Sequence, residues 1–369
     1  MSPSLLKAGL LAATLTAAFV VGWELHWRGQ GFPISYNDDE SLWASKRRLV
    51  YNTSPAGPVL IGASRIKFDL DQPTWRRLTG RQPVQLALVG TSPRPVLANL
   101  ANDPRFHGTV VVDVVEGIFF SPTGSRQEKR ALDRLKAYPK WSLAQQLSFR
   151  LDRALESKLV FLDEDRLTLD AFLNNLALPS RPGVFMMPLF PPKFAFNDFD
   201  RQTRISAAFV ADTAMQHRMQ SVWTRLGSTS GKHGDGGDTL TALIQSVKQS
   251  VDRIRARGGR VVFVRCPSDG PFWAAEQRGY PRAQYWDRLL ADTHTPGVHF
   301  ADYPALAGFR CLEWSHLTPA DAATFTAALI PVLEQQTGWR IATHPVAARG
   351  GPGCPVRTAA PAALLPLNH

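Results

Sequence analysis

The feature that most constrains the fold of this sequence is a series of short apolar stretches, separated by segments with helical signals. The five stretches cover residues 59–61, 84–89, 109–115, 260–265 and 298–302. Strands that alternate with helices form parallel sheets. The third stretch is β-branched almost throughout, which is typical of a strand buried on both faces. We therefore expect an α/β fold with a doubly wound, mainly parallel five-stranded sheet.

Helix-end signals support this alternation. Asp71 is placed to cap the start of a short helix, and Gly80 is placed to end it. Later, Thr318-Pro319 followed by Asp321 combines an N-cap, a proline at the first helical position and an acidic residue three positions after the cap. The last helix of the domain is therefore predicted to begin at this point.

The N-terminal residues predict a membrane helix. Residues 8–23 carry no charge, and together with Leu5 and Leu6 they have about the minimum length of a membrane-spanning helix. A cleaved signal peptide is the competing interpretation. We favour an uncleaved anchor, because no small-x-small site with a polar start follows and Trp23 to Arg28 suits a membrane interface. With Lys7 inside, the rest of the chain would lie on the periplasmic side of an inner membrane.

These signals divide the chain into four parts. The membrane anchor covers residues 1–28, a linker 29–54, the α/β domain 55–338, and an Ala/Pro/Gly-rich flexible tail 339–369. Within the domain, residues 121–237 interrupt the alternation as a long helical and irregular insertion. An insertion of that length usually forms a lid or a binding element.

Charge and cysteine content exclude some classes of function. The net charge of +11 is spread along the chain without a zinc-finger or recognition-helix pattern, so the sequence does not predict nucleic-acid binding. The charge fits a nearby anionic membrane or acidic polymer, and equally an ordinary solvated surface. The three cysteines have no zinc spacing. Cys266 and Cys311 could pair in an oxidising compartment, which the sequence leaves open, and Cys354 lies in the tail.

The candidate catalytic residues are a serine, a histidine and a glutamate. Ser64 directly follows the strand at 59–61, and Glu313-Trp314-Ser315-His316 comes just before the last helix. Sites in parallel sheets lie at the carboxyl ends of the strands, so these residues are expected at one edge. His316 would act as base for Ser64, and Glu313 would orient the imidazole. The N–H groups of Ser64 and Gly90 are candidates for the oxyanion hole.

Two known motifs are not matched. Ile66 stands where the second glycine of Gly-x-Ser-x-Gly would be, so the nucleophile elbow of α/β-hydrolases is missing. Gly62 has no glycine partners at the spacing of a dinucleotide fingerprint, and no cofactor or metal is predicted.

With these motifs the chain resembles the SGNH (GDSL-like) hydrolase superfamily. It looks most like the membrane-anchored members associated with alginate O-acetylation and teichoic-acid D-alanylation. The resemblance covers residues 59–115 and 260–333, through Gly62-Ala63-Ser64, Gly90 and Glu313-Trp314-Ser315-His316. It implies Ser64 as nucleophile, His316 as base and Glu313 as acid, in a flavodoxin-like fold.

The sequence departs from that family pattern at two places. Glu313 replaces the usual aspartate, and the Gly-x-Asn-Asp block is absent where residues 115–118 read Val-Glu-Gly-Ile. Arg65 could bind an anionic group of a substrate. The interpretation that we favour for Arg65 is a structural ion pair with an acid such as Asp69 or Glu116.

The resemblance implies acyl-ester chemistry on a cell-surface polysaccharide or glycan, by an O-acetyltransferase or an acetylesterase that forms an acyl-Ser64. It also implies a membrane-bound O-acyltransferase as partner, and no cofactor. The alternative is a non-catalytic scaffold or glycan-binding partner in such a complex. Loss of the third block and the Glu313 replacement favour that alternative.

Overall fold

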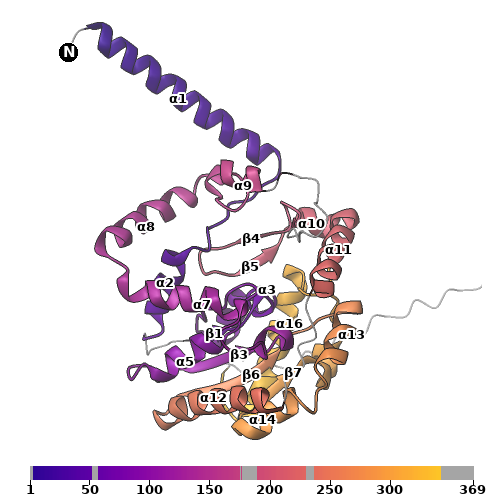
Figure 1. Ribbon diagram of the computed structural model, residues 1–369. Helices are drawn as coiled ribbons and strands as arrows, with labels where there is room; N and C mark the ends of the chain where they lie inside the picture. The colour runs from indigo at the N-terminus through magenta and orange to yellow at the C-terminus, as the bar shows by residue number, and fades with distance from the viewer. Residues whose placement is uncertain (1–2, 52–56, 175, 177–188, 230–236, 342–369) are drawn as a thin grey trace, which may run out of the picture.

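A computed structural model of the 369-residue chain describes residues 3–51, 57–174, 176, 189–229 and 237–341. Parts of the predicted insertion, residue Cys354 and nearly all of the predicted tail lie outside the described residues. The fold is α/β, with a parallel sheet beneath a layer formed by the insertion and a long N-terminal helix at the top (Figure 1).

Five parallel strands form the main sheet, in the order β2-β1-β3-β6-β7. They are β1 (Val59–Ile61), β2 (Val84–Gln85), β3 (Thr109–Asp113), β6 (Arg260–Arg265) and β7 (Gly297–His299). All five predicted strands are therefore confirmed, three of them with different bounds, since the third ends at Asp113 instead of residue 115. The second ends at Gln85 instead of residue 89. The fifth gives way at Phe300 to a 3₁₀ turn, η3 (Phe300–Asp302).

Apolar cores cover both faces of this sheet. Successive side chains of a strand point to opposite faces, so Ile61, Val110 and Phe263 join one core while Leu60, Val111 and Val262 join the other. The first core includes residues of α5 (Arg94–Asn102), α12 (Gly237–Ala256) and α14 (Trp286–Thr293). The second includes residues of α3 (Ser64–Asp69), α4 (Gln72–Thr79), α15 (Pro304–Ala307) and α16 (Pro319–Thr337).

Local capping explains where several of these helices begin and end. The Asp71 carboxylate accepts a hydrogen bond from Thr74 N at 2.9 Å, and Gly80 ends α4 in the left-handed conformation (φ 67°). Thr318 caps α16 by accepting from Asp321 N at 3.2 Å. The helix starts predicted from these residues are confirmed.

The insertion forms a layer between the carboxyl edge of the sheet and the N-terminal helix (Figure 1). The short helix α6 (Glu116–Phe119) leads into it. Its elements are α7 (Arg126–Ala137), η1 (Tyr138–Lys140), α8 (Leu143–Glu156), η2 (Val160–Leu162), α9 (Leu169–Asn174), the antiparallel pair β4 (Ala195–Asn197) and β5 (Thr203–Ile205), α10 (Ala207–Ala211) and α11 (Thr213–Thr229). The remaining helices are α2 (Glu40–Leu49), within the predicted linker, and α13 (Gly270–Gly279) after β6.

A buried arginine joins the insertion to the sheet. Arg201 adopts a positive φ of 62° and donates from its guanidinium to the carbonyl oxygens of Gln85 and Ala87, at 2.6 and 3.0 Å. These carbonyls lie at the end of the sheet where β2 is the edge strand. Because exposed strand edges pair readily with other chains, Arg201 also protects this edge.

The N-terminal helix α1 (Pro3–Gly29) projects from the rest of the molecule (Figure 1). Among the described residues it is the one helix long and apolar enough to cross a membrane, and its apolar window has no buried residue. Its C-terminal end contacts the insertion. Glu24 accepts hydrogen bonds from Val160 N at 2.9 and 3.0 Å, and Arg28 donates to Lys158 O at 2.7 Å.

Candidate active site

Ser64 is the first residue of α3, two residues after the end of β1. The two-residue turn between them depends on Gly62. A Cβ atom at Gly62 would lie 2.5 Å from the Cβ of Asp113 and 2.7 Å from Cγ2 of Ile66. Any larger residue would therefore push β1 away from β3. Gly62 keeps the turn close to the sheet, so that Ser64 emerges at its carboxyl edge.

Glu313 holds His316 through both the backbone and the side chain. Its Oε1 accepts from His316 N at 2.7 Å and lies 2.8 Å from His316 Nδ1. Glu313 is fully buried, and its other oxygen accepts a hydrogen bond from the indole N–H of Trp223. With Nδ1 donating to the carboxylate, the neutral imidazole keeps its lone pair on Nε2. That tautomer is the one a general base requires.

The turn between Glu313 and His316 has an unusual backbone. Trp314 adopts a positive φ of 76°, which is rare for a bulky residue. Two hydrogen bonds hold it there, from Trp314 N to Cys311 O at 2.9 Å and from Asp269 N to Trp314 O at 2.9 Å. Backbone strain of this kind costs about 1–3 kcal/mol and gathers at functional sites. Here the turn lets the Glu313 carboxylate reach the imidazole ring of His316, three residues later.

Aromatic side chains surround His316. The Phe68 ring stacks on the imidazole with centroids 4.1 Å apart, and Trp223 and Phe194 lie at 6.1 Å. His316 Nε2 is buried and forms no hydrogen bond within the described structure, so it is not bonded to the Ser64 hydroxyl. A buried polar atom without a partner is uncommon in proteins and calls for an explanation.

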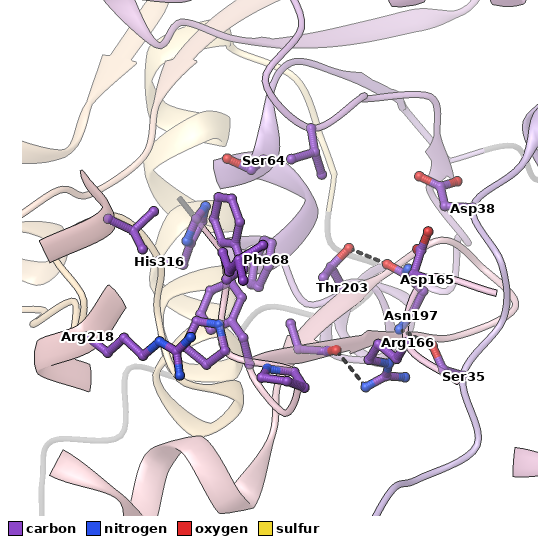
Figure 2. A pocket seen from close by; sticks show the side chains of 18 of the residues that line it. Ser35, Asp38, Ser64, Phe68, Asp165, Arg166, Asn197, Thr203, Arg218 and His316 are labelled. Atoms are coloured by element: carbon purple, nitrogen blue, oxygen red, sulfur yellow. Dashed lines mark hydrogen bonds between the residues drawn. The ribbon is translucent and has the colours of Figure 1, made fainter. Parts of the chain in front are cut away.

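Ser64 and His316 line the same pocket, which has a volume of about 1210 Å³. Figure 2 shows these two residues toward one side of it, with Asp38, Asp165 and Arg166 toward the other. Most of the remaining lining comes from the insertion, including Leu173, Phe190, Arg218 and Trp223. The structure therefore brings the predicted nucleophile and base to one cavity, and the insertion builds most of its wall.

Buried charges neutralise one another on the far side of this pocket. Asp38 accepts from Lys67 Nζ at 2.6 Å and from Arg201 Nε at 2.5 Å. Burial alone would raise the pKa of Asp38, but these two cations hold it far below its usual range. Burial lowers the pKa of Lys67 to about 8, against the opposing charge of Asp38. Lys67 is one helical turn beyond Ser64 and also lines the pocket.

Gly90 lies in an exposed turn after β2, with a positive φ of 63°. Leu88 N donates to Gly62 O at 3.1 Å, which ties this turn to the one that precedes Ser64. The neighbouring Val89 lines the pocket. The two predicted oxyanion donors, Ser64 and Gly90, therefore lie on loops that are connected to each other at the carboxyl edge of the sheet.

Arg65 points away from the pocket, into the protein. Its Nη2 lies 2.6 Å from Glu276 Oε1 of α13, and its side chain is almost fully buried. The acid in this ion pair is neither Asp69 nor Glu116, the two that the sequence suggested. Glu276 in turn bonds Arg265, which also pairs with Glu116, at 3.0 Å. The residue next to Ser64 is thus part of a buried ionic network.

Asp113, below the Gly62 turn, should make stability depend on pH. Burial raises its pKa to about 6, although Arg65 and Arg265 act in the opposite direction. The folded protein then holds a proton that the unfolded chain loses near pH 4, so this carboxyl stabilises the fold only at low pH. Its contribution of about 3 kcal/mol should be lost as the pH rises from about 4 to 6.

We expect Asp113→Asn to remove this dependence. Between pH 4.5 and 7.5 the variant should lose about 2 kcal/mol less unfolding free energy than the native protein. Urea unfolding of the detergent-solubilised chain at both values measures the difference. Asp170→Asn, at an exposed aspartate of α9, should behave as the native protein does. The prediction would be contradicted if the Asp113 variant and the native chain lost the same unfolding free energy between pH 4.5 and 7.5.

Sequence reasoning did not find the residues that the insertion contributes. Trp223 is separated from Glu313 by 90 positions, and no motif marks it as a hydrogen-bond donor to that carboxylate. Lys67 could have been noted from its spacing of three residues from Ser64, which places both near one face of a helix. Cys266 and Cys311 are both buried and free, so the described structure contains no disulfide between them.

Comparison with known proteins finds no family model and no curated protein that matches this chain. The expected relationship to SGNH hydrolases therefore has no support beyond the sequence motifs around Ser64, Gly90 and His316.

Proposed function

We propose that this protein carries out serine-dependent acyl-ester chemistry on a cell-surface polysaccharide or glycan, as an O-acetyltransferase or acetylesterase. The observation that carries the proposal is the state of His316. Glu313 fixes its Nδ1 at 2.8 Å, and its Nε2 is buried without a partner in a pocket that Ser64 also lines. A base that is oriented on one side and unpaired on the other is suited to take a proton from a nearby hydroxyl.

The proposed reaction proceeds in two halves. Ser64 Oγ attacks the acyl carbonyl carbon of a donor ester while His316 Nε2 takes the hydroxyl proton. The donor alcohol then leaves with that proton, and the acyl group remains as an ester on Ser64. In the second half a sugar hydroxyl or water gives its proton to His316 and attacks the acyl-enzyme, which releases Ser64. Backbone N–H groups at Ser64 and Gly90 would stabilise the oxyanion.

We also propose a fold family for the domain and a cellular location for the protein. It takes the domain as a doubly wound, SGNH-like fold, supported by a strand order that is also that of flavodoxin-like folds. It places α1 in an inner membrane and the bulk of the chain in the periplasm, supported by the length and apolar character of α1. A membrane-bound O-acyltransferase would be the partner that supplies acyl groups.

The size of the pocket supports a substrate larger than a simple ester. Pockets for small molecules typically span about 300–1,000 Å³, and this one has about 1210 Å³. Both charged residues, such as Arg166 and Arg218, and apolar ones, such as Phe194, line it. A pocket of this kind can hold sugar units and an acyl group together.

Active-site labelling tests the proposal. The full chain in detergent should form a covalent adduct with a fluorophosphonate probe, and mass spectrometry should locate it on Ser64. Ser64→Ala should abolish the adduct. His316→Ala should slow its formation by about 10³-fold, because the unassisted serine hydroxyl is a weak nucleophile.

A second serine of the same pocket provides the matched control. Ser221 also lines the cavity, and Ser221→Ala should label like the native chain. Absence of an adduct in a folded protein, repeated with a small acetyl ester in case the insertion excludes the probe, would argue against the enzyme. Labelling that is independent of His316 would argue against the proposed base.

A non-catalytic role is the second candidate function, and one observation favours it. Phe68 stacks on the His316 ring, with ring centroids 4.1 Å apart. A glycan-binding scaffold of an acyltransferase complex would need only the pocket. The labelling experiment separates the two candidates, because only the enzyme forms the adduct.

A further inference from the structure

Helix α8 has its apolar side facing outward and polar side chains facing the protein. Leu143, Leu147, Leu151 and Leu155 recur every fourth residue and are between 52% and 78% exposed. On the opposite side, Arg153 and Glu156 are buried and pair with each other at 2.6 Å. A surface helix of a globular protein normally has the reverse arrangement. The leucine side of α8 is therefore left without a partner within the described part of the chain.

Polar contacts with the linker fix this orientation of α8. Arg153 donates to Asn37 O at 3.0 Å, and Glu156 accepts from Asn37 Nδ2 at 2.6 Å. Arg153 also pairs with Asp39 at 3.2 Å. Turning the leucines inward would break these contacts and expose buried charges, so the outward orientation belongs to the fold.

The exposed apolar surface continues from α8 to the base of α1. Helix α9 adds exposed Leu169 and Leu173, and its Phe172 ring stacks on Trp27 of α1 with centroids 5.7 Å apart. Between the two helices, η2 is bonded to Glu24 of α1. In Figure 1, α9 lies at the C-terminal end of α1 and α8 runs out sideways from the same region. Two apolar surfaces, one of membrane-spanning length, thus meet at one place.

The charge of this part of the sequence favours an anionic lipid surface. Residues 126–158, from the start of α7 to two residues beyond α8, contain nine basic and four acidic side chains. Lys136, Lys140 and Arg150 among them are exposed. Helices that lie on membranes combine an apolar side with lysines and arginines near the headgroups.

We propose that α8 and α9 lie in the headgroup–acyl boundary of the bilayer that α1 crosses, with their leucines directed into the lipid. This inference rests on the proposed membrane location of α1 and does not depend on the chemistry of Ser64. It extends the contact with the membrane from a single spanning helix to a surface of the domain. It also places Leu173, which lines the pocket, at the lipid surface.

Site-specific fluorescence in nanodiscs with anionic lipid tests the proposal on the full chain. In a Cys354→Ser background, which leaves the buried Cys266 and Cys311, a single cysteine replaces Leu147 and carries an environment-sensitive fluorophore. Asp152→Cys, on another side of α8, is the matched control, and Leu11→Cys reports on α1. We expect the label at 147 to emit at shorter wavelength and to be quenched by nitroxide-bearing lipids, most strongly by nitroxides near the headgroup.

Three outcomes would overturn the proposal. A label at 147 as accessible to aqueous iodide as the label at 152, with the label at 11 in lipid, would refute the contact of α8 and leave the anchor intact. A label at 11 outside the lipid would remove the anchor as well. A shift at 147 without lipid quenching would show that protein, such as a second copy or a partner subunit, covers the leucines.

Discussion

In the Glu313→Gln variant, Ser64 should react with a fluorophosphonate probe about 10³- to 10⁴-fold more slowly than in the native protein. Glutamine keeps the size of the buried side chain, but its amide can donate as well as accept. If the amide N–H faces His316 Nδ1, the ring proton moves to Nε2, which then cannot accept the proton of Ser64. The second-order rate constant for fluorophosphonate labelling measures the loss.

Two comparisons make that result specific to the candidate site. Glu40→Gln, at an exposed glutamate at the start of α2, should label at the native rate. Thermal unfolding of Glu313→Gln should remain cooperative, because the substitution leaves no cavity. A labelling rate within about tenfold of native would mean that the carboxylate does not control the tautomer of His316.

Replacing Arg265 with methionine should have the largest effect on stability. Its guanidinium is fully buried between Glu116 and Glu276, and it also donates to Ser268 Oγ at 2.9 Å. Without it, the Glu116 carboxylate loses its buried cationic partner, and Glu276 keeps Arg65 and the Ser268 hydroxyl. Breaking a buried ionic network in this way costs about 3–5 kcal/mol. We expect the unfolding free energy to fall by that amount in urea denaturation.

Arg282 provides the contrast for this prediction. It also bonds two carboxylates, those of Asp287 and Asp302, but its side chain is nearly half exposed. Arg282→Met should cost no more than about 1 kcal/mol, because water screens exposed ion pairs. Equal losses in the two variants would show that burial does not decide the strength of the Arg265 network.

The sheet could be predicted from the sequence because its signals are local. The stretch at 109–112 is β-branched, and Val110, Val111 and Val112 are buried between the two cores. Asp71, Gly80 and Thr318 mark helix ends through their own side chains or backbone freedom. The second strand was predicted too long. Beyond Gln85 the chain keeps only single hydrogen bonds, from Leu86 N to Leu60 O of β1 and from Leu88 N to Gly62 O in the turn that follows, without forming regular strand.

The candidate site was predictable only where the sheet edge supplies it. Parallel strands end at a common edge of the sheet, which predicts that Ser64 and His316 lie at the same edge. Trp223, Phe68 and Arg166 complete the site through contacts across long sequence separations, which no local pattern records. Arg65 shows the same limit, because its partner Glu276 lies 211 positions away.

The junction between α1 and the insertion has a consequence for how the proposed polymer substrate would reach the protein. Glu24 bonds η2 and Arg28 bonds Lys158 just before it, so no flexible tether separates the apolar helix from the domain. A domain on a flexible tether samples a range of distances from the membrane, which lowers its effective concentration at any one distance. With α1 in a bilayer, a rigid junction holds the pocket at one height. Polymer emerging at that height would meet it at high local concentration, and finished chains farther out would lie beyond reach.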